Sequence, residues 1–418
     1  MSDLNSCLTC SSDTCINKFE EFKKNFSSQK EFKYNFEEHS LPITMMLSLT
    51  DNCNLSCPYC FVKQKPNYMT FEIAEQALQY LKNNCKKRGM DLTVNKPPVN
   101  FFGGEPLLCY DTIIKPLVEK YHNDFSFGIT TNGVLLNEDI VDFFYKYNVQ
   151  ILFSFDGVEE VQNIQRPGKN FDSFQKILNN IPYLLLRFPH VTMRATLTKH
   201  SIPYILDTVL MAEDLGFKNV TFCPNAFEDW DEIDENKLTE QFLKVGLHIY
   251  KKLYKTEEYP VIAINPLVKG VATITSAING VFGYNNTIMR CGLGTNTCAI
   301  TPTGDIVPCQ EKTSSPTVVL GNIYTGINSK IHEEFLNNYF NSINKVTCDK
   351  NCSNKARLLC ASNICPSRME DLNYRISSAE CIFHKVTAKV ASRLHLLCAD
   401  SFNPYIRSYF SEGEIYIC

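Results

Sequence analysis

The chain has 418 residues, 44% of them hydrophobic, with 41 Lys and Arg against 45 Asp and Glu. This length exceeds the size at which one hydrophobic core usually stops growing, so more than one domain is expected. The formal net charge of −4 provides no basic field and argues against nucleic acid or anionic lipid as a partner.

No membrane segment is expected. The longest apolar stretches, such as Ile181–Phe188, contain Pro or Arg and fall short of a membrane span. The N-terminus lacks a basic region followed by an apolar core, which is the pattern of a secretory signal. These features predict a cytoplasmic protein.

Short apolar segments alternate with amphipathic segments from residue 42 to about residue 255. The expected strands are rich in β-branched or aromatic residues and end at Gly, Asn, Asp or Pro. The segments between them carry apolar residues at helical spacing. Serial β-α units predict a parallel sheet with helices outside it. In chain order, the expected strands and helices are Ile43–Thr50, Thr70–Lys87, Val99–Gly103, Tyr110–Asn123, Ser126–Thr131, Asn137–Tyr147, Ile151–Asp156, Phe174–Arg187, Thr192–Thr198, Ile202–Leu215 and Val220–Pro224.

Polar and cysteine-containing sequences follow these strands. Residues 51–60, 103–106, 130–133 and 154–157 come directly after the first four strands, and Arg194 lies in the fifth. The pattern alone fits either a doubly wound sheet or a barrel. In α/β barrels the active site lies at the C-terminal ends of the strands, so the placement of these residues favours a full or partial barrel.

Cys53, Cys57 and Cys60 form a C-x3-C-x2-C loop in a chain with 19 cysteines. In a reducing compartment, closely spaced cysteines indicate metal ligands or catalytic thiols. Three thiolates can hold three irons of a [4Fe–4S] cluster and leave the fourth iron open. Zinc is the alternative, but it would need a fourth ligand from elsewhere in the chain.

The string CNLSCPYCF at residues 53–61 resembles the signature of radical S-adenosylmethionine (radical SAM) enzymes. GGEP at 103–106, TTNG at 130–133 and SFDG at 154–157 follow in the family's order. The resemblance implies a partial (β/α)6 TIM-like barrel. It also implies that the open iron binds S-adenosylmethionine, whose reductive cleavage gives a 5′-deoxyadenosyl radical that abstracts a substrate hydrogen.

The same resemblance implies which residues bind the cofactor. Gly103 and Gly104 would let the backbone approach the amine of the cofactor, and the Glu105 carboxylate would accept hydrogen bonds from that amine. Ser154 is expected at the cofactor carboxylate, with Arg194 as a second candidate.

Two further positions belong to this expected site. Tyr59 should lie near the adenine. Asp156 has either a cofactor-binding role or a turn role, since Asp-Gly also closes a strand. Asn132-Gly133 is expected to be a turn.

A second group of cysteines lies between residues 291 and 381, and Gly304 before Cys309 indicates a hairpin that delivers a ligand. Eight cysteines suffice for two sites of four thiolates, whether iron–sulfur clusters or structural zinc. Their order resembles the SPASM extension of radical SAM enzymes, which holds two auxiliary [4Fe–4S] clusters. The late spacing departs from that family's pattern, which leaves the pairing open. By order, one cluster would take Cys291, Cys298, Cys309 and Cys365, and the other Cys348, Cys352, Cys360 and Cys381.

The expected organisation has four parts. Residues 1–41 form a helical extension with Cys7, Cys10 and Cys15, which either bind metal or substrate or are exposed thiols of a tail. Residues 42–270 form the radical SAM partial barrel, 271–385 the small cysteine-rich SPASM domain, and 386–418 a C-terminal helix and tail. The acidic segment at 229–235 is expected to be a solvated connection.

These resemblances imply an oxidoreductase with three [4Fe–4S] clusters and S-adenosylmethionine as cofactors. The leading expectation is a maturase that forms a thioether or carbon–carbon cross-link in a ribosomally synthesised precursor peptide. Flavodoxin or ferredoxin would donate the electron. The alternatives are anaerobic sulfatase maturation, which converts Cys or Ser to formylglycine, and a non-catalytic zinc or iron–sulfur scaffold.

Overall fold

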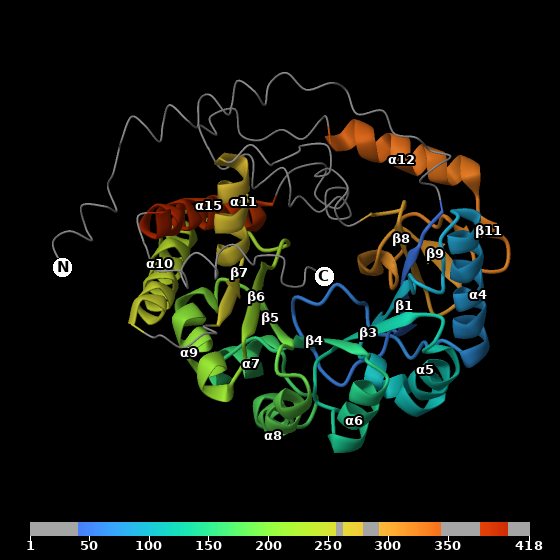
Figure 1. The fold of residues 1–418 in the computed structure, drawn as a ribbon, viewed down its shortest axis with the longest axis horizontal. Helices are drawn as coiled ribbons and strands as arrows, with labels where there is room; N and C mark the ends of the chain where they lie inside the picture. The colour runs from blue at the N-terminus through green and yellow to red at the C-terminus, as the bar shows by residue number, and fades with distance from the viewer. Residues whose placement is uncertain (1–40, 256–261, 279–291, 344–376, 400–418) are drawn as a thin grey trace.

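The computed structural model describes residues 41–255, 262–278, 292–343 and 377–399 (Figure 1). Several predicted features lie outside these residues. They are the N-terminal extension up to residue 40, with Cys7, Cys10 and Cys15, and five of the C-terminal cysteines, namely Cys291, Cys348, Cys352, Cys360 and Cys365.

The described strands form one mixed sheet in the order β11-β10-β9-β8-β1-β2-β3-β4-β5-β6-β7. Strands β1 to β7 are parallel to one another, and β8 adds to β1 in parallel, whereas β8 to β11 pair antiparallel. The sheet is open, which confirms the predicted partial barrel. The strands are β1 Thr44–Thr50, β2 Pro98–Gly103, β3 Ser126–Thr131, β4 Gln150–Ser154, β5 Thr192–Leu197, β6 Asn219–Pro224, β7 Ala263–Asn265, β8 Thr297–Ile300, β9 Asp305–Val307, β10 Gly321–Asn322 and β11 Gly326–Ile327.

Helices α4, α5, α6, α8 and α9 lie along the outer side of the arc of parallel strands (Figure 1). Side chains of Thr70, Asn137 and Asp172 cap α4, α6 and α8 by accepting a backbone N–H three residues later. The helices are α4 Phe71–Lys87, α5 Lys115–Tyr121, α6 Glu138–Lys146, α7 Glu159–Gln165, α8 Ser173–Arg187, α9 Ile205–Leu215, α10 Glu232–Lys255, α11 Leu267–Ile278, α12 Ser329–Ile343 and α15 Ser378–Ala399.

Three predicted elements are shorter than expected, among them the helix expected at Ile202–Leu215, which is α-helical only as α9 after a 3₁₀ turn at Ile202–Tyr204. The helix expected at 110–123 is regular only as α5, after a 3₁₀ turn at Pro106–Cys109 and a π turn at Tyr110–Ile114. Pro116 has no N–H with which to continue an α-helix from the preceding turn. Strand β4 ends at Ser154 and not at Asp156, because the Asp156 N–H donates to Gln162 Oε1 (2.9 Å).

The core fills the space between the parallel strands and their helices. Phe144, Phe153 and Phe155 are fully buried, and the stacked rings of Phe101 and Phe127 have centroids 5.4 Å apart. Burying such apolar side chains is the dominant stabilising contribution to a fold of this kind. It fixes the strand ends at which the predicted site residues lie.

The C-terminal part of the chain joins the barrel at two places. The hairpin β8–β9 pairs with β1, with Thr44 opposite Thr297 and Leu47 opposite Ile300. Gly304 lies at the predicted hairpin with φ +88°. Helix α15 packs on α10 and α11, where Gly270 allows close approach of Ala391. The expected domain boundaries at 270 and 385 therefore fall inside helices α11 and α15.

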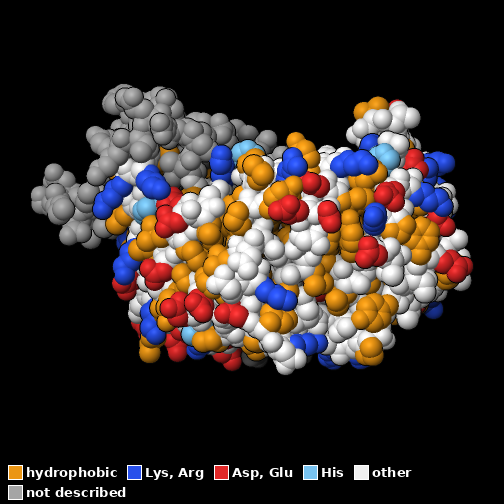
Figure 2. Space-filling view, turned by 90° about the horizontal axis from the view of Figure 1, so that it is seen from below, with side chains coloured by type: hydrophobic (Ala, Val, Ile, Leu, Met, Phe, Trp, Pro, Cys, Tyr) orange, Lys and Arg blue, Asp and Glu red, His pale blue; other side chains and the backbone are white. Residues whose placement is uncertain are grey.

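The surface agrees with the mixed composition. Figure 2 shows basic and acidic side chains interspersed over the face that it displays, with apolar side chains between them. In the described part of the chain, every helix is too short or too polar to cross a lipid bilayer.

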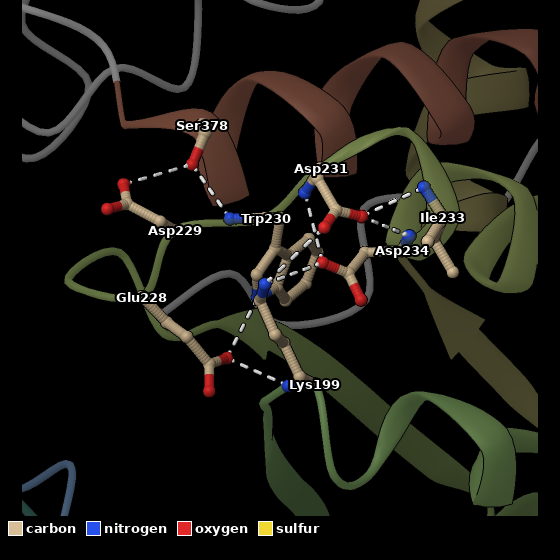
Figure 3. A network of polar contacts seen from close by, with 8 residues as sticks. All are labelled: Lys199, Glu228, Asp229, Trp230, Asp231, Ile233, Asp234 and Ser378. Atoms are coloured by element: carbon tan, nitrogen blue, oxygen red, sulfur yellow. Dashed lines mark hydrogen bonds and ion pairs between the residues drawn. The ribbon is translucent and has the colours of Figure 1, made fainter.

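The acidic segment at 229–235 is exposed at Asp229, Asp231 and Glu232, as expected for a solvated connection, but Trp230 and Asp234 within it are buried. Trp230 is buried, its indole N–H donates to Glu228 Oε2 (2.8 Å), and its backbone N–H donates to Ser378 Oγ at the start of α15 (2.8 Å; Figure 3). Lys199 Nζ lies 3.1 Å from the carboxylate of buried Asp234. The backbone bond to Ser378 and the buried indole thus fasten this segment at the start of α15.

We expect Trp230→Phe to lower the free energy of unfolding by about 1 kcal/mol, because it deletes one hydrogen bond to a partly exposed carboxylate while keeping an aromatic ring. Urea denaturation would measure the change. Tyr324→Phe removes a hydroxyl from an aromatic residue that is 62% exposed and serves as the control. An equal effect in both variants would contradict a specific role for the indole N–H.

Candidate cofactor and iron–sulfur site

The three predicted cluster cysteines lie in the loop that follows β1. The Cys60 N–H donates to the Cys57 carbonyl (3.1 Å) and so closes a tight turn between these two residues. Burial raises the pKa of Cys53 to about 11 and that of Cys57 to about 12, and it also raises the pKa of Cys60. Without a metal the thiols stay protonated at neutral pH, whereas coordination to iron would deprotonate them.

The spacing of this trio bears on the type of metal. Among the residues that the structure describes, no three His, Cys, Asp or Glu side chains surround a point that could hold a single metal ion. A zinc site needs its ligands about 2.0–2.3 Å from one ion. A cluster takes each thiolate at a different iron, which allows a wider spacing. The choice of a cluster over zinc stays a prediction from the sequence.

The GGEP segment is held against the end of β1. Gly104 N–H donates to the Thr50 carbonyl (2.8 Å), and Glu105 N–H donates to the Asn52 carbonyl (2.9 Å). A Cβ on Gly103 would lie 2.3 Å from the Thr50 oxygen, and one on Gly104 would lie 2.1 Å from the Asn52 oxygen. This backbone contact requires both glycines, and the expected approach of the cofactor amine to them stays a prediction.

Glu105 is buried below the mouth of the barrel. Its Oε1 accepts from Leu107 N (3.0 Å) and Thr131 Oγ1 (2.8 Å), and its Oε2 accepts from Asn132 N (2.8 Å). Burial raises the pKa of Glu105 to about 7, although these hydrogen bonds act in the opposite direction. Oε2 keeps one acceptor position, which suits an incoming ammonium group.

We expect the pH dependence of stability to report on Glu105. Its folded pKa of about 7 exceeds the ordinary value of 4.5, so the folded protein binds this proton more tightly than the unfolded chain. Glu105 therefore makes stability fall as the pH rises from about 4.5 to about 7. Melting temperatures recorded at about pH 5 and about pH 8 should differ less in Glu105→Gln than in the wild type.

Glu75 offers a matched control for this measurement. It is a surface glutamate whose pKa is lowered by hydrogen bonds from Lys120 and Tyr121. Glu75→Gln should leave the alkaline loss of stability in place. If both variants behaved alike, the pH dependence would not come from Glu105.

Asp156 is a buried anchor for the cysteine loop. Its Oδ2 accepts from the Tyr59 hydroxyl (2.6 Å) and from Gln165 Nε2 (2.7 Å). Its Oδ1 accepts from Thr196 N (2.8 Å) and lies 3.0 Å from Arg166 Nε. Three hydrogen bonds and the ion pair with Arg166 surround this carboxylate, so Asp156 positions Tyr59. A contact of Asp156 with the cofactor stays a prediction.

Arg166 is a residue that the sequence analysis missed. Its guanidinium carbon lies 5.5 Å from the centre of the Tyr59 ring, and its charge opposes the upward shift in the pKa of Cys57. Arg166 follows the short helix α7, which was also not predicted. A lone arginine before Pro-Gly gives no spacing signal from which a site role could be inferred.

The two residues expected at the cofactor carboxylate are neighbours. Ser154 in β4 pairs in register with Arg194 in β5, and Ser154 is buried. Paired residues on adjacent strands place their side chains on the same face of the sheet. The structure thus brings Ser154 and Arg194 together at one edge of the expected site.

Only three of the predicted auxiliary ligands fall within the described residues. Cys298 is buried in β8, and burial raises its pKa to about 12. Cys309 follows β9 and accepts from Glu311 N (3.5 Å), and Cys381 lies in the first turns of α15. The proposed grouping of the eight cysteines stays a prediction.

Comparison with known proteins bears on this site. Residues 47–238 match the Radical SAM superfamily. A radical SAM cyclopropyl synthase, TigE of Paramaledivibacter caminithermalis, is 24% identical over 40% of this chain and 38% of its own length. A cysteine-type anaerobic sulfatase-maturating enzyme of Clostridium novyi is 32% identical over 32% of this chain and 38% of its own length. The chain thus spans less than two thirds of these relatives.

Solved structures match a larger share of the chain. Native anSMEcpe with bound AdoMet and the Cp18Cys peptide has a TM-score of 0.67 at 18% identity, over 85% of this chain and 98% of the other. Streptococcus suis SuiB bound to its precursor peptide SuiA has a TM-score of 0.50 at 16% identity, over 76% of this chain and 77% of the other. These likenesses show a shared fold.

The sequence motifs, the partial barrel and the superfamily match at residues 47–238 agree. Residues 47–238 are therefore a radical SAM domain, the fold with which the enzymes of that superfamily use S-adenosylmethionine and a [4Fe–4S] cluster.

Proposed function

We propose that the chain is a maturase that modifies a side chain of a ribosomally synthesised peptide, forming a thioether or carbon–carbon cross-link. The observation that carries the peptide-modifying part of this proposal is the structural likeness over 85% of the chain to anSMEcpe, a structure that contains AdoMet and a peptide. The cross-link is proposed from the sequence resemblance. The likeness to SuiB with its precursor peptide supports it from a second solved structure. When bound, S-adenosylmethionine and the reduced cluster supply the radical that removes a substrate hydrogen.

The residues of the chain have separate tasks in this proposal. Cys53, Cys57 and Cys60 hold the cluster. Glu105 accepts hydrogen bonds from the cofactor amine, and Ser154 with Arg194 binds its carboxylate. The close contact of the GGEP segment with the end of β1 keeps Glu105 at a fixed distance from the cysteine loop.

The cysteine-rich part is proposed to hold two auxiliary [4Fe–4S] clusters. If all eight cysteines are ligands, neither auxiliary cluster has an open iron, and each acts in electron transfer or in shaping the substrate pocket. The partners are then a precursor peptide and an electron donor such as flavodoxin or ferredoxin, in the cytoplasm. Iron analysis of the reconstituted protein should give about 12 iron atoms per chain, four for each of the three clusters.

Sulfatase maturation is the second candidate, favoured by the sequence match to the Clostridium novyi enzyme. That reaction oxidises Cys or Ser to formylglycine and leaves no cross-link. Mass spectrometry of the product distinguishes the two reactions, because formylglycine carries an aldehyde that reacts with a hydrazide probe.

The test of the proposed function is an anaerobic assay with a chemical reductant, S-adenosylmethionine and candidate substrates. Short cysteine-rich peptides and a sulfatase-derived peptide are the two substrate arms. We expect methionine and 5′-deoxyadenosine to form, together with a peptide that has lost a pair of hydrogen atoms. If the cofactor is cleaved and only the sulfatase-derived peptide is converted, the cross-linking proposal is wrong and sulfatase maturation is the function. Absence of cleavage by a fully iron-loaded protein would favour the scaffold alternative.

A further inference from the structure

Asn132 connects the two halves of the proposed site. It lies in the TTNG turn after β3 and is 6% exposed. Its backbone N–H donates to Glu105 Oε2 (2.8 Å), and its side-chain Nδ2 lies 3.7 Å from Cys53 Sγ and 2.8 Å from Asn54 Oδ1. One residue therefore contacts both the expected amine acceptor and a cluster cysteine.

The orientation of the Asn132 amide follows from its partners. Its Oδ1 accepts from Val134 N (3.1 Å), so the NH2 group is the side that faces the sulfur. In the opposite orientation the Asn132 side-chain oxygen would face Asn54 Oδ1 and Cys53 Sγ. Asn132 could then donate a hydrogen bond to neither atom.

The turn itself fixes the position of this amide. Gly133 has φ +75°, and a Cβ there would lie 2.3 Å from the ring of buried Phe153. The Gly133 N–H also donates to Thr131 Oγ1 (3.1 Å), whose hydroxyl donates to Glu105. The backbone of the turn that carries the Asn132 side chain is thus fixed by the Gly133 conformation and by the hydrogen bonds of Thr131.

We propose that Asn132 donates an N–H···S hydrogen bond to the Cys53 thiolate when the cluster is bound, and that this bond raises the reduction potential of the cluster. Hydrogen bonds to ligand sulfurs are among the factors that set cluster potentials. A donor stabilises the reduced cluster more than the oxidised one, because the reduced cluster carries one more negative charge. Leu55 N, 3.4 Å from the same sulfur, is a second donor that a side-chain substitution leaves in place.

A buried donor beside Asn132 also supports a sulfur acceptor at this point. Asn54 Nδ2 is buried and has no hydrogen-bond partner among the described residues. An unpaired buried N–H group is costly, so a further acceptor is expected at this point. Cluster sulfur would provide one. The inference rests on Cys53 as a cluster ligand, as in the proposed function, and is independent of the identity of the substrate.

The test is a redox titration of the reconstituted enzyme followed by electron paramagnetic resonance. The open-iron cluster is recognised as the signal that changes on addition of S-adenosylmethionine, and the titration is then run without it. At a fixed potential, we expect the ratio of reduced to oxidised cluster to fall about tenfold in Asn132→Ala, which corresponds to about 59 mV for a one-electron couple. Asn132→Asp, which has the same shape but carries negative charge, should lower it further.

Thr131→Val is the matched control for the turn. It removes the hydroxyl's bonds with Glu105 and with the Gly133 N–H but keeps the Asn132 side chain, so its ratio of reduced to oxidised cluster should stay within about twofold of the wild type. A shift in Thr131→Val as large as that in Asn132→Ala would mean that loosening of the turn causes the effect, and the inference would be wrong.

A second readout uses the wild-type protein alone. Pulsed resonance in H2O and D2O should detect an exchangeable proton coupled to the reduced cluster, and that coupling should weaken in Asn132→Asp. If Asn132→Ala does not load iron, this measurement and the Asn132→Asp titration decide the question. If an iron-loaded Asn132 variant keeps the wild-type reduction potential and proton coupling, the inference about Asn132 is wrong, while the cluster assignment stands. A wild type without a cofactor-responsive cluster would overturn the cluster assignment as well.

Discussion

Replacing Cys53, Cys57 and Cys60 together by alanine is expected to remove about four iron atoms per chain and to bring S-adenosylmethionine cleavage below detection. The physical reason is that a [4Fe–4S] cluster with an open iron has three protein ligands, and no cofactor chelation is possible without it. Iron and sulfide analysis after anaerobic reconstitution, with chromatography for 5′-deoxyadenosine, measures both effects. The two predicted auxiliary clusters should keep about eight iron atoms.

Cys85→Ala is the matched control for this experiment. Cys85 is fully buried in α4, and its loss changes packing without affecting the cysteine loop. It should keep the full iron content and the cleavage activity. An iron content unchanged in the triple variant would show that these cysteines are not ligands. Zinc in place of iron in the wild type would contradict the cluster assignment.

Asp156→Ala is expected to lower the free energy of unfolding by about 3 to 5 kcal/mol. The Asp156 side chain is completely buried, and Arg166, whose side chain is 11% exposed, would be left without its carboxylate partner. The Tyr59 hydroxyl would lose its acceptor as well. Chemical denaturation of the reduced, metal-free protein measures the loss.

The exposed pair Asp142–Arg187 provides a control with the same chemistry. Asp142 lies 2.7 Å from Arg187 Nε and accepts from the Tyr183 hydroxyl, but both charged side chains are more than one third exposed. Asp142→Ala should cost no more than about 1 kcal/mol because water replaces the lost partner. In addition, Asp156→Ala combined with Arg166→Met should recover part of the loss. Equal costs at both aspartates would contradict the argument from burial.

The sequence was sufficient for the repeating architecture because each strand is marked by its composition and by the residues that end it. The Thr70 cap and the spacing of apolar residues in 70–87, for example, predicted α4 to within one residue. The C-terminal cysteine-rich part was predicted only from cysteine order. Nothing in the spacing of the segment 297–300 indicated that it would pair with β1, because that contact joins residues about 250 positions apart.

The site was predictable where several residues form a motif, as at the cysteine loop. It was less predictable where a single side chain acts through a long-range contact. Arg166 and Asn132 come from different strand-helix units, and their roles depend on Tyr59 and Cys53, which precede them by some 80 to 110 positions. For Asp156 the sequence left a cofactor-binding role and a turn role open, and its long-range bonds with Tyr59 and Thr196 could not be predicted from the SFDG motif.

The pairing of β8 with β1 has a consequence for the cooperativity of the whole molecule. Strand β1 carries the cysteine loop at its end, and its outer edge is covered by residues that lie some 250 positions later in the chain. A chain that ended at residue 270 would expose that edge, with its unpaired N–H and C=O groups, and would be prone to aggregate. The barrel and the hairpin that bears Cys298 and Cys309 should therefore unfold together. A substitution that destabilises one of them should also lower the stability of the other.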